Sequence, residues 1–257
     1  ALEPAQKAID MSGGHPQESW LQLLLALRLE REEFQLAVPI LRHLVDAAPQ
    51  KKTYWLQLSA VHAQLGAFDQ AAVPLQLAYY GGLLTEHQDI ERLSQILLRI
   101  GIPYRAGQLL GEAISKSKIP ATAKSYELLA NCWVAAREFE KSIDPLRKAA
   151  NLSDDGELFL RLAEVYVQKE DWGNASEATR QALAKGKIKN AGNAQVLMGI
   201  AAYNQKKVDE AKTWFERSRG HAENRQQADG WLAHIESERE AKAQAAATPV
   251  SPTPIGQ

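Results

Sequence analysis

A small side chain recurs along this chain at intervals close to 34 residues. The six positions are spaced by 34, 35, 36, 33 and 36 residues, and they are Ala37, Ala71, Ala106, Ser142, Ala175 and Ala211. A fixed period in this range is the signature of a repeat architecture. The chain is therefore predicted to fold as a series of similar units stacked on one another, and not around a single globular core.

Apolar columns at fixed offsets from the small residue indicate that each unit is a pair of helices. An apolar residue stands sixteen positions before it in five units, at Leu21, Trp55, Ile90, Tyr126 and Phe159, with Gln195 as the exception in the sixth. Further apolar residues follow at offsets of three, four and seven, which is the helical period and not the strand period of two. Gly66 and Gly101 mark the turn between the two helices of a unit.

The stretch ALAKGKI (182–188) ends a helix and then supplies an apolar side chain where a polar loop is expected. The same pattern occurs in AYYGGLL (78–84) and AISKSKI (113–119). A Gly or small polar residue after a helix suits the left-handed turn that ends it. We expect the apolar residues Leu84, Ile119 and Ile188, called here the fold-back residues, to pack onto the preceding helix. The three longer repeats are those that contain this insertion.

The pattern W-x2-L-x3-(H/Y/W)…A-x3-(L/F)-x2-A resembles the tetratricopeptide repeat (TPR). The second unit, YWLQLSAVHAQLGAFDQAAVPLQLA, and the fifth, LFLRLAEVYVQKEDWGNASEATRQAL, match it best. The resemblance implies an all-α fold, a right-handed α-solenoid of about six TPR helix pairs. The expected organisation is six TPR-like repeats over 19–222, a capping helix over 223–244 and a disordered Pro-rich tail over 245–257. Residues 1–18 are either a partial helix of a preceding repeat or a frayed N-terminus.

Composition excludes several classes of function. Thirty Lys and Arg against 31 Asp and Glu leave no strong field that would attract nucleic acid. Cys132 is the only cysteine, so an internal disulfide is excluded. No run of the sequence approaches the roughly 20 apolar residues that a membrane span needs. The expected partners are therefore proteins or peptides.

The titratable residues form no pattern that is typical of catalysis. The six histidines show no metal-binding spacing, and His62 falls in a packed column of the repeat. Cys132 lies inside a predicted helix, where a buried thiol is inert. Asp154, Asp155 and Glu157 are interpreted as acidic residues at a helix N-terminus. We therefore expect no enzymatic activity, no catalytic or metal-binding residues and no cofactor.

The resemblance to TPR proteins also implies where partners bind. In such stacks the first helix of each pair lines a concave groove, and residues one, five, eight and nine positions beyond the Trp55 column face into it. Amides and a tyrosine beside aliphatic residues suit an extended peptide or a helix. The predicted protein-binding residues are Gln95, Arg99, Asn131, Glu164, Gln168, Tyr203 and Asn204. Lys124 and Asn131 match fragments of a carboxylate-binding set, but the rest of that set is missing, so no such clamp is predicted.

Several stretches, among them LAYYGGLLTE, GIPYRAGQLL, NAGNAQVLMGIAAYN and WLAHIESE, resemble TPR proteins that accompany TonB–ExbB–ExbD energy-transduction systems of Gram-negative bacteria. This resemblance implies a periplasmic accessory of TonB-dependent iron or siderophore uptake, with TonB, ExbB or ExbD as partners. The chain starts at Ala1 without a signal peptide, so a periplasmic location requires a processed form. The alternatives are a general TPR adaptor or co-chaperone unrelated to TonB, and a cytoplasmic location.

Overall fold

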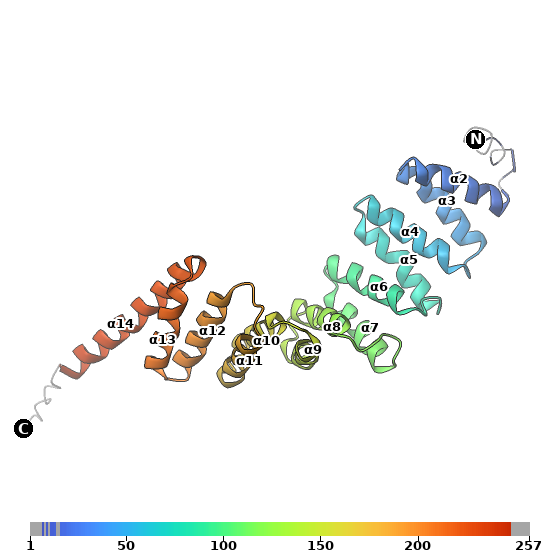
Figure 1. The fold of residues 1–257 in the computed structure, drawn as a ribbon. Helices are drawn as coiled ribbons and strands as arrows, with labels where there is room; N and C mark the ends of the chain where they lie inside the picture. Colours follow the sequence, from blue (N-terminus) through green and yellow to red (C-terminus); the bar gives the residue numbers. More distant parts are fainter. Residues whose placement is uncertain (1–6, 8, 10, 14–15, 248–257) are drawn as a thin grey trace, which may run out of the picture. The chain divides into compact units, whose positions relative to one another are not determined.

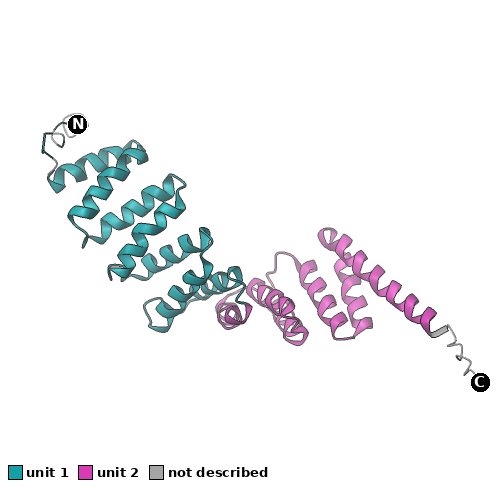
Figure 2. Ribbon diagram, turned by 180° about the vertical axis from the view of Figure 1, so that it is seen from behind, with its two compact units in different colours: residues 1–138 teal, residues 139–257 magenta. Residues whose placement is uncertain are grey.

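The computed structural model describes residues 7, 9, 11–13 and 16–247, and these form α-helices and one short 3-10 helix without any strand. The described part of the chain falls into two compact units, residues 1–138 and 139–257 (Figure 2). The expectation for residues 1–18 falls in large part, and that for the tail from 248 onward entirely, outside the described residues. The capping helix, expected to end at 244, continues to Ala247, so residues 245–247 are helical and not part of a disordered tail.

Unit 1 is a series of helices in which each packs on the next along the chain (Figure 1). Its helices are α2 (Glu18–Glu30), α3 (Phe34–Ala47), α4 (Lys52–Gln64), α5 (Phe68–Tyr80), α6 (His87–Arg99), α7 (Pro103–Ser115) and α8 (Ala123–Ala135). The first helices of the third and fourth pairs, α6 and α8, also contact one another. This lateral contact builds the groove described below.

Unit 2 follows the same order and ends in a longer helix. It contains α9 (Phe139–Leu152), α10 (Glu157–Gln168), α11 (Trp172–Lys185), α12 (Ala191–Asn204), α13 (Val208–Arg219), the 3-10 turn Ala222–Asn224 and α14 (Arg225–Ala247). Helix α14 packs on α13 through Ala228 and Ile235, which are buried, and through Trp231 and Leu232. The predicted all-α fold of successive helix pairs with a C-terminal capping helix is confirmed.

The small-residue column lies at the closest helix contacts. All six members are at most 1% exposed: Ala37, Ala71, Ala106, Ser142, Ala175 and Ala211. Interiors are packed as densely as organic crystals, so a larger side chain at such a position has no space. A glycine serves the same purpose at Gly199, where an added Cβ would lie 2.5 Å from the Phe215 ring. The register that the sequence predicted is therefore correct in both units.

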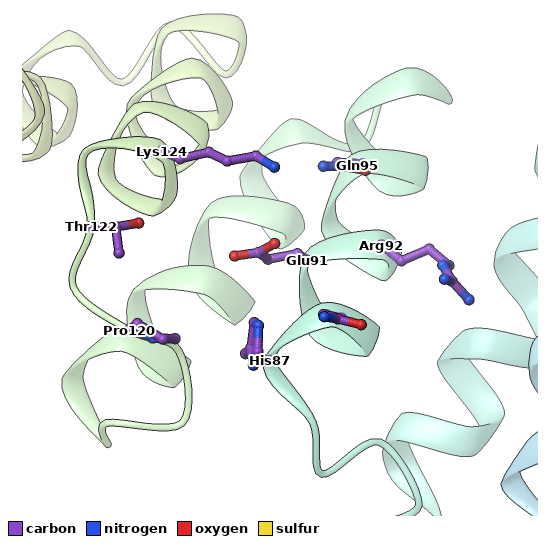
Figure 3. Close-up of a pocket in the computed structure, with 8 residues that line it drawn as sticks. His87, Glu91, Arg92, Gln95, Pro120, Thr122 and Lys124 are labelled. Atoms are coloured by element: carbon purple, nitrogen blue, oxygen red, sulfur yellow. The ribbon is translucent and has the colours of Figure 1, made fainter. Parts of the chain in front are cut away.

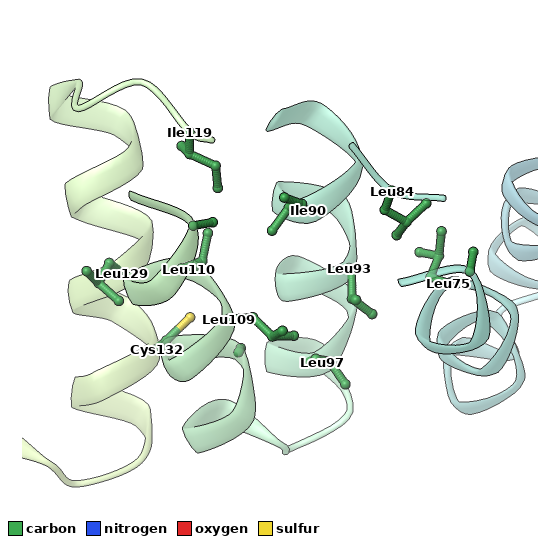
Figure 4. Packing of buried hydrophobic residues seen from close by; sticks show 13 residues of the cluster. Leu75, Leu84, Ile90, Leu93, Leu97, Leu109, Leu110, Ile119, Leu129 and Cys132 are labelled. Atoms are coloured by element: carbon green, nitrogen blue, oxygen red, sulfur yellow. The ribbon is translucent and has the colours of Figure 1, made fainter. Parts of the chain in front are cut away.

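Two of the three fold-back residues, Leu84 and Ile119, pack as expected in a core cluster with residues of the preceding helices α5 and α7. Leu84 and Ile119 are buried in the core of unit 1 (Figure 4), and Ile188 is half-buried in unit 2. Each follows a residue with a positive φ, of +73° at Gly82, +55° at Ser117 and +72° at Gly186. After α7, the amides of Lys118 and Ile119 both donate to the Ala113 carbonyl, at 2.8 and 3.2 Å. Both bonds end on one of the carbonyls that the helix end leaves without an intrahelical partner.

The turn inside each helix pair has one backbone geometry throughout the chain. The residue five positions before the small residue always has a positive φ, between +57° and +76°, at Glu32, Gly66, Gly101, Arg137, Glu170 and Lys206. Only two of the six are glycine, the residue that adopts this conformation without steric cost. The two glycine turns, at Gly66 and Gly101, were predicted from the sequence. The other four, at which a residue with a side chain is held in the left-handed region, were not predicted.

Candidate protein-binding grooves

A groove between α6 and α8 is the best-formed candidate site in unit 1. It encloses about 470 Å³ and is lined by His87, Gln88, Glu91, Arg92, Gln95, Pro120, Thr122 and Lys124 (Figure 3). Its two long walls are the first helices of the third and fourth pairs. Its third side is the loop that carries the fold-back residue Ile119, because burial of Ile119 places Pro120 and Thr122 at the mouth.

A capping box fixes the α8 side of the groove. The Thr122 side chain accepts from the Ser125 amide at 3.2 Å, and the Ser125 hydroxyl accepts from the Thr122 amide at 2.9 Å. The bond to Thr122 satisfies the Ser125 amide at the helix N-terminus, while the Thr122 amide also donates to the Pro120 carbonyl at 2.9 Å. Lys124 lies inside this capped first turn, so its backbone is held in place while its side chain extends over the groove.

The polar groups of the groove are available to a ligand. Among the described residues, Glu91, Gln95 and Lys124 have no hydrogen-bond or ion-pair partner. Figure 3 shows the Lys124 side chain reaching from α8 toward Gln95 on α6, with the Glu91 carboxylate between the two helices. Donors and an acceptor therefore face the same space. This combination suits the alternating N–H and C=O groups of an extended peptide.

The predicted binding residues of unit 1 have different environments. Gln95 is exposed and lies in the groove. Arg99 is exposed one turn further along α6, and its guanidinium lies over the Phe68 ring, 3.8 Å from the centroid. Asn131 is half-buried on α8 and already has an interaction partner. Gln95 is thus the predicted residue of unit 1 that both lines the groove and has hydrogen-bonding groups without a partner in the described structure.

In unit 2 the predicted residues lie along α10 and α12. Glu164 is exposed and accepts a hydrogen bond of 3.3 Å from the Asn193 amide group, which links the two helices. Gln168 is exposed near the end of α10. Asn204 donates to the Ile200 carbonyl of its own helix at 2.9 Å, so one of its polar groups is already used.

Tyr203 belongs to an aromatic cluster that joins α12 to the capping helix. Its hydroxyl lies 3.0 Å from Nε2 of His234, and its ring lies 5.4 Å from that of Trp231. Trp231 in turn stacks on Phe215, with an angle of 3° between the rings. A hydrogen bond with the Glu238 carboxylate, followed by burial, raises the pKa of the Tyr203 phenol. Tyr203 therefore helps to hold α14 in place, in addition to the binding role that was predicted.

Sequence reasoning left several lining residues of the groove out of the predicted set. His87 and Arg92 were missed because they do not stand one, five, eight or nine positions beyond the Trp55 column, the spacings expected to face the groove. Thr122 and Pro120 were missed because they lie in the loop between repeats. The 36-residue spacing between Ala106 and Ser142 was the available signal, since the extra residues form this wall of the groove.

Burial shifts the pKa of two ionisable side chains, His62 and Cys132. His62 is 4% exposed, and burial, followed by the charge of Arg42, lowers its pKa. Burial raises the pKa of the Cys132 thiol to about 12. Within the described ranges, no group of three or more His, Cys, Asp or Glu residues is arranged to hold a metal ion. None of the described helices is both long and apolar enough to cross a membrane.

Comparison with known proteins supports the repeat assignment. Residues 160–228 match the family model described as tetratricopeptide repeat, so this stretch of the chain consists of TPR units. No curated protein matches the chain.

Several solved structures are similar to this chain in fold. A crystal structure of the MamA protein is 18% identical, with a TM-score of 0.56, over 78% of this chain and 98% of that one. The C-terminal part of a TPR repeat-containing protein from Cytophaga hutchinsonii is 15% identical, with a TM-score of 0.60, over 90% and 92% of the two chains. PilW, a type IV pilus biogenesis factor, is 12% identical, with a TM-score of 0.50, over 79% and 93%. At these identities the likeness concerns the fold alone.

Proposed function

We propose that this TPR protein is a non-catalytic scaffold that binds a segment of another protein in the groove between α6 and α8. The observation that carries the proposal is the convergence of Glu91, Gln95 and Lys124, none of which has a partner among the described residues. Concave sites with a few convergent polar groups are the usual binding sites of proteins. The aliphatic parts of these three side chains, together with the capped first turn of α8, form a rigid wall of the groove.

Site-specific photo-cross-linking in the native host tests this use of the groove. A photoreactive residue at Gln95 should capture a different protein as partner, whereas the same residue at Gln108, an exposed glutamine on α7 that does not line the groove, should not capture that protein. The Lys124→Glu substitution should abolish capture from position 95, because it places a second carboxylate beside Glu91. Equal capture from positions 95 and 108 would contradict the assignment of this groove.

We further propose that the partner is a component of a TonB–ExbB–ExbD system and that the protein acts in the periplasm during iron or siderophore uptake. The support for this finer proposal is the resemblance of LAYYGGLLTE, GIPYRAGQLL and related stretches to accessory TPR proteins of such systems. Deletion should impair growth on a ferric siderophore as sole iron source, and wild-type protein should restore it where the Lys124→Glu variant does not. Fractionation should recover the protein with periplasmic markers.

The alternative is a general adaptor or co-chaperone unrelated to TonB. Normal growth of the deletion strain on ferric siderophore, together with capture of chaperones from position 95, would favour the adaptor. In that outcome the groove proposal stands and the TonB proposal fails.

A further inference from the structure

The outward face of α5 carries an apolar stripe. Val73, Leu77 and Tyr80 are 55%, 52% and 65% exposed, and they are spaced by four and three residues. Residues at this spacing lie above one another on a single helix face. Isolated exposed apolar residues are ordinary, but an aligned set marks a surface that a partner can cover.

This stripe is particular to α5. The three equivalent positions in the other outer helices hold polar, charged or small residues in nearly every case. They are Pro39, His43 and Asp46 in α3; Gln108, Glu112 and Ser115 in α7; Asp144, Lys148 and Asn151 in α9; Glu177, Gln181 and Ala184 in α11; and Thr213, Arg217 and Gly220 in the last pair. The repeat fold therefore does not require apolar residues at these places.

Opposite charges stand at the two ends of the stripe. Asp69 is exposed in the first turn of α5 and has no partner among the described residues. At the other end, Arg105 of α7 donates to the Tyr80 hydroxyl at 3.1 Å and to Gln108 at 3.4 Å, with no carboxylate bonded to it in the described structure. The stripe thus begins with an unpaired negative charge and ends beside a positive one.

We propose that α5 is the contact between two copies of this chain, which pair antiparallel about a twofold axis. In this arrangement the Val73 side chain of one copy packs against Leu77 of the other, and Asp69 of each copy meets Arg105 of its partner. A twofold interface must be self-complementary. The end-to-end charge order of the stripe meets this requirement when two α5 helices run in opposite directions, and it would place like charges together if they ran in the same direction.

Sedimentation velocity of the full chain tests the interface. One helix face buries less than the roughly 800 Å² per partner of a standard interface, so the affinity should be weak. The dimer should therefore form only at the higher protein concentrations of a series from about 1 µM to 1 mM. Leu77→Glu should weaken association at least about tenfold. Leu152→Glu is the matched control, because Leu152 is a 55% exposed leucine on α9, outside the proposed contact. A chain that stays monomeric throughout the series, or a dimer that survives Leu77→Glu, would overturn the proposal.

A second test reverses the charges at positions 69 and 105 in two separate variants. It compares each variant alone with a mixture of both, so it does not rest on a single substitution. Asp69→Arg alone and Arg105→Asp alone should each weaken self-association, since each creates two like-charge contacts across the twofold axis. An equimolar mixture of the two variants should form a mixed dimer, because every 69–105 contact then joins opposite charges. Absence of the mixed dimer, with both variants folded by circular dichroism, would exclude a second copy and leave a different protein helix as the occupant of the stripe.

Discussion

Gly66 and Glu170 occupy the same position in the turns of two different helix pairs, with φ of +73° and +57° respectively. The backbone conformation is thus set by the repeat and not by the residue. A side chain in the left-handed region costs roughly 1–2 kcal/mol relative to the right-handed one. Glycine avoids this cost but loses more conformational freedom on folding.

Replacing Glu170 with Gly should therefore stabilise the protein modestly, by about 0.5–1 kcal/mol. The Glu170 side chain is exposed and makes no hydrogen bond or ion pair in the described structure that would be lost. Urea unfolding should show a higher midpoint with an unchanged slope. Gly66→Ala is the reverse test and should destabilise by a similar amount, although an added Cβ would meet no atom within 4 Å. If Gly66→Ala were neutral, backbone strain would not be the cause.

Enlarging the small-residue column should destabilise the stack. Ala175→Leu introduces three carbon atoms at a position that is 1% exposed, and overpacking of this kind costs roughly 1–3 kcal/mol. Ala184→Leu on the same helix is the matched control, because Ala184 is exposed. Thermal unfolding should show a lower midpoint for the first variant and little change for the second. Equal midpoints for Ala175→Leu and the wild type would refute the register.

The buried His62 should make stability depend on pH. Burial and Arg42 lower its pKa from the ordinary 6.5, so the folded protein keeps the imidazole neutral while the unfolded chain takes up a proton. The unfolded state then binds more protons, and the free energy of unfolding falls as pH drops below about 6.5 until the folded pKa is reached. His62→Leu should flatten this dependence between pH 7.5 and 5, as measured by urea midpoints. His43→Gln, at an exposed position, should leave it unchanged.

Cys132 should not react with thiol reagents in the folded protein. Its side chain is fully buried, and burial raises its pKa to about 12, so thiolate is almost absent at pH 8. A chromogenic disulfide reagent should modify the native chain only at the rate of unfolding and should react at once in urea. The single cysteine makes the signal unambiguous. Rapid stoichiometric modification without denaturant would show that this part of unit 1 opens readily.

The fold was predictable because its determinants are local and repeated. Ala71 and Ala175 belong to the same small-residue column, which has one member in each helix pair. The helix register can therefore be deduced from six units at once. The turn at Glu170 was not predictable in the same way, because glutamate carries no preference for a positive φ. Its conformation is imposed by the two helices that it joins.

The candidate site was predicted only in part. Gln95 lies in the groove because it stands five positions beyond the Trp55 column, and this spacing determines which face of α6 it occupies. Lys124 lies there because the loop before it is shaped by the burial of Ile119, which depends on contacts distant in sequence. Tyr203 engages His234 of the capping helix, and this contact between side chains 31 residues apart is not encoded in the columns of the repeat. The binding roles of all seven predicted residues remain predictions.

Burial of Leu84 and Ile119 behind the ends of their helices has a consequence for how such a chain can vary. Each fold-back residue ends the packing of its helix before the connecting segment begins. Residues can therefore be added or removed beyond the fold-back residue without changing the orientation of the next helix pair. Length changes between neighbouring repeats are thereby uncoupled from core packing. The junction after α5 is accordingly a place where new sequence could be inserted without disturbing the core, whereas the junction after α7 also forms one side of the groove.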